Sequence, residues 1–306
     1  MEVETPLILR LPGQEPYLTP LKVNVKNEKK ESFTGYLHTS PEYAMKKMLA
    51  AGFDNIFSIC KTFRDEESFG GTHNPEFTMI EWYRKNADYF NIMDDTENLF
   101  KYISKQKIAG LDEVFSKKIN QTWQRKSMKE LWREFVNVNL DDYLTTEKMT
   151  VLCREKGFNL TDGLQYEDYF YEIFLNFIEP KLGHDAPVFV YQYPKQMAAL
   201  SKLSVEDPRY AERFELYIDG LELANAFSEL TDATEQRERL VEERELRQIS
   251  GKDVFDVDDE FIKALEVELP PMSGIALGVD RLVQGFLACK NIDNVLPLPM
   301  SKLFNK

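Results

Sequence analysis

Two glutamates, Glu215 and Glu222, have the spacing of a pair that could hold a metal ion. Between them, Asp219-Gly220 is a favoured two-residue hairpin turn. The register of that hairpin predicts that Glu215 faces Ala224 and that both glutamates share one sheet face, roughly 7 Å apart. On that face Ala224 and Ala226 would leave open space. Mg²⁺ carrying nucleotide phosphates would relieve the repulsion between the carboxylates; the alternative is two solvated glutamates.

An earlier pair of extended segments, 56–66 and 77–83, adds basic and acidic chemistry. A Gly70-Gly71 loop of about nine residues joins them into an antiparallel hairpin and is long enough to close over a ligand. Alternation places Arg64 and Glu66 on one face of the first strand, with Thr62, Cys60 and Ser58. On the second strand one face carries Phe77, Met79, Glu81 and Tyr83. An arginine there could bind a carboxylate or phosphate, and Glu81 with Tyr83 could bind an ammonium group. An ordinary Arg–Glu cross-strand pair is the alternative.

Arg281 falls in the first turn of a predicted helix that follows Gly278. A cation at this positive end of the helix dipole is unfavourable unless an anion lies nearby. The sequence contains no G-x-x-x-x-G-K-[ST] motif and no G-x-G-x-x-G after a strand. Neither a P-loop nor a Rossmann site is therefore supported, and a nucleotide site would have to be built on an antiparallel sheet.

The elements that must position these residues are hairpins separated by blocks of helix. We expect a helix that starts at Ser40-Pro41-Glu42 and stops at Gly52, and others over 89–103 and, from an Asp232 capping box, to about Gln248. The charges of this last helix indicate a solvated face. The stretch 104–185 is expected to be mostly helical. Further strands are expected over 188–193, 213–219, 221–227 and 274–278, followed by a final helix from Val279. This order predicts an α+β fold with an antiparallel sheet, in a single domain over 1–306.

Composition excludes several classes of protein. The chain has 306 residues and a formal net charge of −14, from 38 basic and 52 acidic side chains, so generic nucleic-acid binding is disfavoured. Three scattered cysteines indicate reduced thiols in a cytosolic protein, and three scattered histidines make a zinc site implausible. No apolar run approaches the length of a membrane span, and the N-terminus does not resemble a signal peptide. We expect a soluble cytoplasmic protein.

Three segments together resemble the signature motifs of class II aminoacyl-tRNA synthetases of the lysine-specific kind. The segments 63–66 and 73–83 (FRDE and HNPEFTMIEWY) resemble motif 2, and 274–281 (GIALGVDR) resembles motif 3. The segment 3–6 (VETP) resembles the end of motif 1, so the helix that precedes it in that family is absent from this sequence. Either the start was assigned too late, or a homodimer would have a reduced interface.

Within that superfamily the sequence most resembles the shortened paralogues that ligate (R)-β-lysine to a lysine of translation elongation factor P. No anticodon-binding domain precedes the catalytic segment, and 39–42 (TSPE) resembles the substrate segment of those ligases. Ala276 stands where the synthetases carry glycine. A methyl group there is worth about 1–3 kcal/mol of discrimination, enough to choose between α- and β-amino acids. Ala226 also stands where relatives usually have glycine, which could tighten the ATP side.

The resemblance implies a role for each matching residue. ATP phosphates would be bound by Arg64 and Arg281, the two catalytic residues, with Arg64 also near the substrate carboxylate. Phe77 would stack on adenine. The other residues implied in ATP binding are Glu66, Asn74, Glu215, Leu216 and Gly278. Mg²⁺ would be held by Glu215 and Glu222. The residues implied in binding the substrate are Ser40 and Glu42 for its α- or β-amine, Glu81, Tyr83 and Glu229 for its ε-ammonium, and Glu222, Asn225 and Ala276 in the same pocket. Asn225 can join Glu222 on one face only if the strand contains a bulge.

The implied reaction begins with attack of the lysine carboxylate on the α-phosphorus of ATP, with Mg²⁺ and the two arginines neutralising charge. The acceptor lysine of elongation factor P then attacks the adenylate. No convincing general base is present, and His73 is interpreted as a loop residue. One alternative is a lysine-activating enzyme that charges tRNA or another small acceptor, which the acidic balance disfavours. A second is a non-catalytic lysine-binding paralogue, and a third is a merely structural domain.

Overall fold

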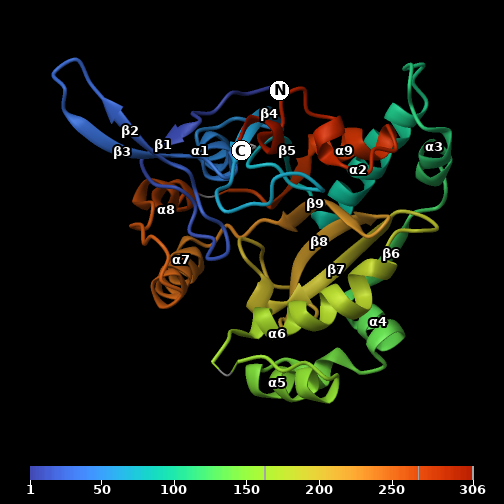
Figure 1. Ribbon diagram of the computed structural model, residues 1–306. Coiled ribbons are helices and arrows are strands. Elements are labelled where there is room, and N and C mark those ends of the chain that lie inside the picture. The colour runs from blue at the N-terminus through green and yellow to red at the C-terminus, as the bar shows by residue number, and fades with distance from the viewer. Residues whose placement is uncertain (162, 268, 305–306) are drawn as a thin grey trace. The chain divides into compact units, whose positions relative to one another are not determined.

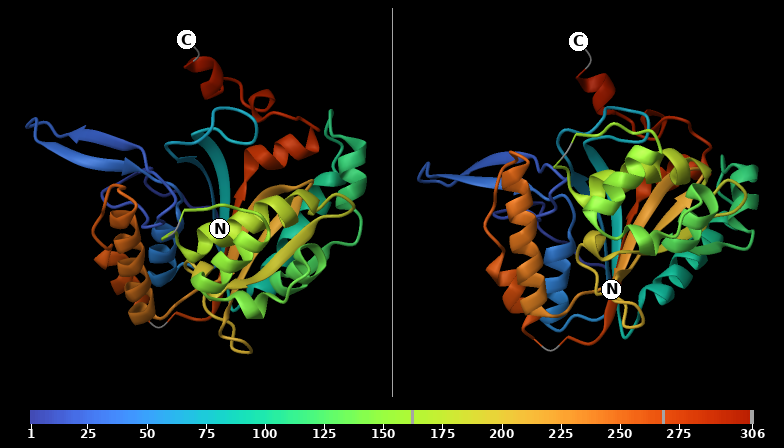
Figure 2. Two further views of the ribbon diagram at one scale, coloured as in Figure 1. Left: turned by 60° about the horizontal axis from the view of Figure 1, so that its bottom comes forward. Right: turned by 90° about the horizontal axis from the view of Figure 1, so that it is seen from below.

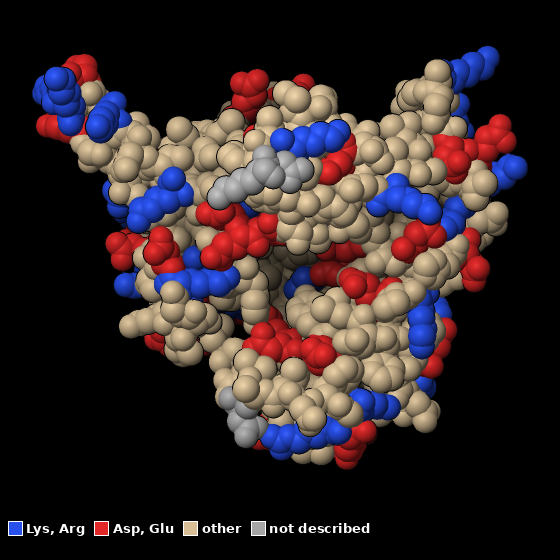
Figure 3. Space-filling model, viewed as in Figure 1, with Lys and Arg blue, Asp and Glu red and all other residues tan. Residues whose placement is uncertain are grey.

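The computed structural model describes residues 1–161, 163–267 and 269–304, and the chain forms two compact units (Figure 1). Unit 1 comprises Met1–Ala87 and Leu230–Lys306, and unit 2 comprises Asp88–Glu229. The three cysteines are free thiols, as predicted. Among the described residues, none of the helices combines the length and the apolar character needed to cross a membrane. Figure 3 shows basic and acidic side chains interspersed over the visible face, without a continuous basic surface.

Unit 1 contains the antiparallel strands β4 (Ile56–Phe63), β5 (Glu76–Lys85) and β10 (Met272–Gly278), with β5 in the middle. The predicted hairpin is therefore confirmed, but its first strand is shorter than expected. β4 ends at Phe63, so Arg64 and Glu66 do not share a strand face as predicted. Glu66 has a left-handed backbone with φ 62°, which ends the alternation of side chains on which that prediction depended.

Helix α1 (Glu42–Ala50) begins one residue later than expected, with Pro41 at the N-cap and the Ser40 hydroxyl accepting the Glu42 N–H. It ends before Gly52, whose φ of 100° suits glycine. Helix α8 (Asp259–Leu265), which we did not predict, contacts both α1 and α7 (Ala233–Ile249) (Figure 1), and the blue and orange helices lie close together in both views of Figure 2. The predicted capping box at Asp232 is confirmed in part: Asp232 caps α7 by accepting two backbone N–H groups, whereas the Glu235 carboxylate accepts from Arg239.

The remaining elements of unit 1 are short. A three-stranded antiparallel sheet has the order β1 (Ile8–Leu9), β3 (Ser32–Leu37) and β2 (Lys22–Lys26). Helix α9 (Val279–Phe286) starts at the predicted residue directly after β10. It is not the final helix, because α10 (Met300–Leu303) follows it.

Unit 2 contains four strands in the order β9 (Leu221–Ser228), β8 (Tyr210–Ile218), β7 (Val188–Pro194) and β6 (Gln124–Ser127). The pair β6–β7 is parallel and the other two pairs are antiparallel, so the sheet is mixed. The fold is α+β as predicted. Strand β6 was missed because its sequence, QRKS, has no apolar residue and hence no alternation to detect.

Helices cover both faces of this sheet. They are α2 (Tyr89–Ser104), α3 (Glu113–Ile119), α4 (Met128–Leu131), α5 (Thr146–Glu155) and α6 (Tyr166–Ile173), with short 3₁₀ and π turns between 132 and 181. The helical segment 128–182 forms one core with Val188, Val190 and Tyr217. On the opposite face Phe189 packs against Trp123. Each large apolar side chain buried in this way contributes about 1.5–3 kcal/mol.

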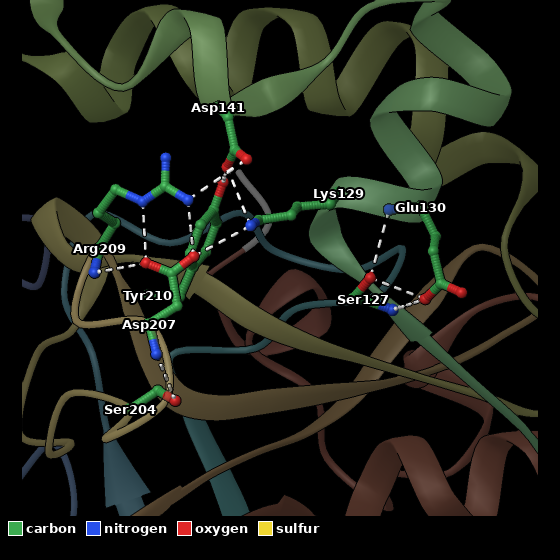
Figure 4. A network of polar contacts seen from close by, with 8 residues as sticks. All are labelled: Ser127, Lys129, Glu130, Asp141, Ser204, Asp207, Arg209 and Tyr210. Atoms are coloured by element: carbon green, nitrogen blue, oxygen red, sulfur yellow. Dashed lines mark hydrogen bonds and ion pairs between the residues drawn. The ribbon is translucent and has the colours of Figure 1, made fainter.

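An ion-pair network fixes the start of β8, the strand that carries Glu215 (Figure 4). The Asp207 carboxylate accepts from the Arg209 guanidinium at 2.8 Å and from Lys129 Nζ at 3.1 Å. Lys129 Nζ also lies 3.0 Å from Asp141, which accepts the Tyr210 hydroxyl. The network joins the β7–β8 connection to the segment around α4.

Candidate functional site

Glu81, on β5 of unit 1, is a buried carboxylate with two hydroxyl partners. It is 1% exposed, and it accepts from Ser40 Oγ at 2.6 Å and from the Tyr83 hydroxyl at 3.2 Å. Burial, with a further contribution from the charge of Glu42, raises the pKa of Glu81 to about 8. Three of the predicted amine-binding residues therefore form one hydrogen-bonded group, and a cationic ligand would favour its ionised form.

The strand register places Ala276 directly opposite Glu81, and Ser58 opposite it on the other side. Directly opposed residues project to the same face of an antiparallel sheet. On β10 that face carries Met272, Gly274, Ala276 and Gly278, and the three of these that lie nearest to Glu81 are small. Small side chains thus stand beside Glu81, and the methyl group of Ala276 is the largest of them.

A buried ion pair lies close to Glu81. Lys46 Nζ is 2.5 Å from Glu42 Oε1, and the Lys46 side chain is fully buried. The charge of Lys46 also opposes the rise in the pKa of Glu81. Burial and the charge of Glu42 raise the pKa of Glu15, which is coupled to Arg64 as well. Our sequence reasoning missed Lys46 and Glu15, because Glu42 and Lys46 have the i, i+4 spacing of an ordinary surface pair.

Arg64 and Phe77 lie together beyond the end of β4. The Arg64 Cζ atom is 5.2 Å from the centre of the Phe77 ring, a cation–π distance. Among the described residues the buried Arg64 Nε has no hydrogen-bond partner. A donor left in this state suits an anionic ligand. The predicted phosphate-binding arginine and adenine-stacking ring are therefore neighbours.

The two remaining motif 2 residues are engaged within the protein. Glu66 is exposed and its carboxylate accepts the Thr19 hydroxyl at 2.7 Å. Asn74 is buried, donating to the Glu76 carbonyl and accepting the Met300 N–H. Asn74 thus holds the C-terminal segment to the motif 2 loop, and its contact with a nucleotide stays a prediction.

Arg281 lies in the first turn of α9, as expected, and reaches the same loop. It donates to the Thr72 carbonyl at 3.1 Å and to His73 Nε2 at 3.0 Å. Burial and the Arg281 charge lower the pKa of His73, which is therefore neutral with its proton on Nδ1, facing Thr72 Oγ1. Both ring nitrogens are in use. This agrees with our interpretation of His73 as a loop residue.

In unit 2 the predicted β8–β9 hairpin turn is confirmed, with positive φ at Asp219 (55°) and Gly220 (72°). The register beyond it differs from our prediction. Tyr217 faces Glu222 as expected, but a bulge follows and Leu216 faces Ala224. Glu215 therefore faces Asn225, and the prediction that it faces Ala224 is wrong.

The bulge changes which side chains share a face. Glu215 and Tyr217 lie two residues apart on β8 and project to the same face of the sheet. Glu222 lies opposite Tyr217 and Asn225 lies opposite Glu215, so these two side chains project to that face as well. The bulge required for Asn225 to join Glu222 is thus present. Ala224 and Ala226 lie on the other face, with Leu216, and do not create the open space predicted above the glutamates.

Glu215 is 5% exposed, so it is not one of two solvated glutamates. One of its oxygens accepts from Arg213 at 2.6 Å, and the other accepts from the Tyr193 and Tyr217 hydroxyls, each at 2.6 Å. Glu222 is half-buried on the same face, and Glu229 is buried just after β9. Within the described residues, no group of three or more His, Cys, Asp or Glu side chains is arranged to hold a metal ion.

Comparison with known proteins gives a consistent result. Residues 1–302 match the family described as tRNA synthetases class II (D, K and N). The chain belongs to this class II tRNA synthetase family. It is 37% identical over 300 residues to an elongation factor P–(R)-β-lysine ligase of Avibacterium paragallinarum, covering 97% of this chain and 87% of that protein. Ligases of the same name from Hamiltonella defensa and Pectobacterium atrosepticum are each 35% identical, over 99% of this chain and 89% of theirs.

The synthetase match extends across both units, including the segments that resemble motifs 2 and 3 in unit 1 and the β8–β9 hairpin in unit 2. Unit 1 presents two guanidinium groups and a carboxylate group suited to an amine. Unit 2 presents two glutamates and an amide on one face.

Proposed function

We propose that this protein is an ATP-dependent ligase that activates (R)-β-lysine, or lysine, as an aminoacyl-adenylate and transfers it to a lysine side chain of elongation factor P. The observation that carries the proposal is the buried Glu81, joined to Ser40 and Tyr83 and placed opposite Ala276. Relatives named as such ligases align with nearly the whole chain and support it.

The amine-binding group accounts for a diamino acid as substrate. Glu81 is held protonated by burial and by Glu42 in the absence of a ligand. An ammonium group would favour its ionised form, and hydroxyls of Ser40 and Tyr83 would orient it. Substrate binding would therefore release a proton from Glu81 near neutral pH. Glu229 in unit 2 is proposed to bind the ε-ammonium as well.

Activation requires that the substrate carboxylate attack the α-phosphorus of ATP, which releases pyrophosphate. We propose that Arg64 and Arg281 neutralise the charge that develops on the phosphates. Phe77, beside Arg64, would stack on adenine. The acceptor amine then attacks the adenylate carbonyl, forming an amide and releasing AMP.

Mg²⁺ would be held by Glu215 and Glu222, and it would supply charge neutralisation to the phosphates. The donor set of Glu215 fits such an ion. A carboxylate offers about four lone pairs, and three donors, Tyr193, Tyr217 and Arg213, occupy three of them. One lone pair on Oε1 remains for a metal, while the three donors fix its direction.

The test is mass spectrometry of elongation factor P after incubation with ATP, the protein and either (R)-β-lysine or α-lysine. We expect the acceptor to gain the mass of one lysyl group, with (R)-β-lysine preferred. A parallel reaction with tRNA addresses the synthetase alternative, and charging of tRNA without modification of the factor would refute the proposal. Absence of ATP–pyrophosphate exchange with both isomers would favour the non-catalytic paralogue.

A further inference from the structure

Arg213, on β8, is a buried arginine that neither our sequence reasoning nor the proposed reaction uses. It is 9% exposed, and its guanidinium carbon lies 4.5 Å from the centre of the Tyr193 ring. Nη1 donates to the Met197 carbonyl at 2.6 Å, Nη2 to Glu215 at 2.6 Å and Nε to Asn225 Oδ1 at 3.2 Å. Three donors of one rigid group are therefore committed, which leaves the side chain a single orientation.

Two of these contacts are to Glu215 and Asn225, which the family resemblance implies in ligand binding. Glu215 lies two residues along the same strand, and Asn225 lies directly opposite Glu215 across the β8–β9 pair. Arg213 thus donates a hydrogen bond to each of these two side chains and restricts the orientation of both. The bulge makes this possible, because the unbulged register would place Ala224 opposite Glu215.

The contact with Asn225 determines which end of its amide is available to a ligand. A guanidinium has donors and no acceptor, so only the amide oxygen can face it. The Asn225 Nδ2 group, with its two N–H donors, must then point away from Arg213. A donor in this position recognises an acceptor, and an ammonium group has none to offer.

We propose that Arg213 is a positioning residue that holds the Asn225 amide so that it donates to an anionic oxygen of the substrates, while it also fixes the direction of Glu215. This inference rests on the proposed function, because it concerns the same substrates. The oxygen belongs either to the carboxylate of the amino acid or to a phosphate of ATP. Both are anionic acceptors, and the experiment separates them.

The experiment measures binding by calorimetry for lysine, for lysinol, which lacks the carboxylate, and for ATP with Mg²⁺. Asn225→Asp is the informative variant, since its oxygen still accepts from Arg213 while the donor is lost. Arg213→Lys keeps the charge and loses the planar fork. We expect each variant to bind lysine at least tenfold more weakly than the wild type, and to bind lysinol with a dissociation constant within about twofold of the wild-type value.

Tenfold weaker ATP binding with lysine unchanged would assign the acceptor to a phosphate and would equally support the role of Arg213. Equal losses for lysine and lysinol would overturn the inference, because the amide would then serve the amines. Unchanged binding of every ligand to Arg213→Lys would also overturn it. Thermal melting of each variant shows that it is folded. If the wild-type protein bound neither lysine nor (R)-β-lysine, the proposed function itself would be refuted. The role of Arg213 would then be tested by the affinity of Arg213→Lys for ATP, and an unchanged affinity would overturn it.

Discussion

The methyl group of Ala276 lies directly opposite the carboxylate-bearing Glu81 across the β10–β5 pair. Both side chains project to one face, where the neighbouring β10 residues are glycines. A change of one methyl group at this position therefore acts on the surroundings of a buried, ionisable group. Under the proposed function this is where α- and β-amino acids would be distinguished.

Replacing Ala276 by glycine is expected to shift the preference from (R)-β-lysine toward α-lysine. The ratio of the two kcat/KM values should change about 10- to 100-fold, corresponding to roughly 1–3 kcal/mol. ATP–pyrophosphate exchange with each isomer measures it. Ala224→Gly is the matched control, because it removes the same methyl group from a strand, on the face away from Glu215. An unchanged ratio in Ala276→Gly would remove Ala276 as a determinant of specificity.

The raised pKa of Glu81 predicts a pH-dependent stability of the ligand-free protein. Between the unfolded value of 4.5 and the folded value of about 8, the native state binds more protons than the unfolded state. The free energy of unfolding therefore falls as pH rises through this window, by about 1.4 kcal/mol per pH unit. Glu81→Gln cannot ionise and should lose this dependence.

Urea unfolding of the wild type and of Glu81→Gln at pH values from 5 to 9 measures the difference. We expect the difference in free energy of unfolding between the two proteins to change in favour of the variant as pH rises to about 8, and to stay constant above that pH. Parallel pH profiles for the two proteins would show that Glu81 is ionised in the native state throughout.

Lys46→Met is expected to impair binding of the amino acid. Without Lys46, Glu42 loses its ion-pair partner, and the positive charge that opposes the rise in the pKa of Glu81 is removed, so Glu81 ionises less readily at neutral pH. The KM for lysine should rise about tenfold at pH 7 and recover partly at pH 8.5, with a smaller change in the KM for ATP.

Lys47→Met is the matched control, one residue along the same helix. Lys47 is part-exposed and pairs with Asp258 at 2.6 Å, away from the Glu81 group. Its removal should change neither KM by more than about twofold, since such pairs contribute little. If the two substitutions raised the KM for lysine equally, the loss of either lysine of α1 would impair binding, and the specific role of Lys46 would be refuted.

Asp207→Asn should destabilise unit 2 modestly through the β7–β8 connection. The bidentate hydrogen bonds from Arg209 hold the pKa of Asp207 well below its usual range, so this stabilisation is present above about pH 4 and is lost as pH falls below it. Because these side chains are part-exposed, we expect about 1 kcal/mol, reduced in 1 M salt. Urea unfolding checks it. Asp94→Asn, which breaks a single contact with Arg125, should have no measurable effect.

Local signals in the sequence determined much of this protein. Asp219-Gly220 specified a hairpin because both positions need a positive φ. The alternation through 77–83 specified the face that carries Glu81, and the position of Arg281 at the start of α9 followed from the residues before it. The motifs themselves indicated the family, which the comparisons then established.

Tertiary structure decided the rest. The bulge beside Glu222 has no glycine or other local mark, and only the pairing of β8 with β9 places Asn225 beside Glu215. Lys46 is buried near Glu81, which is far away in the sequence, and two of the three contacts of Arg213 reach other segments, at Met197 and Asn225. Charged side chains of this kind look like surface residues in a sequence, because their spacing carries no information on which neighbours exclude water from them.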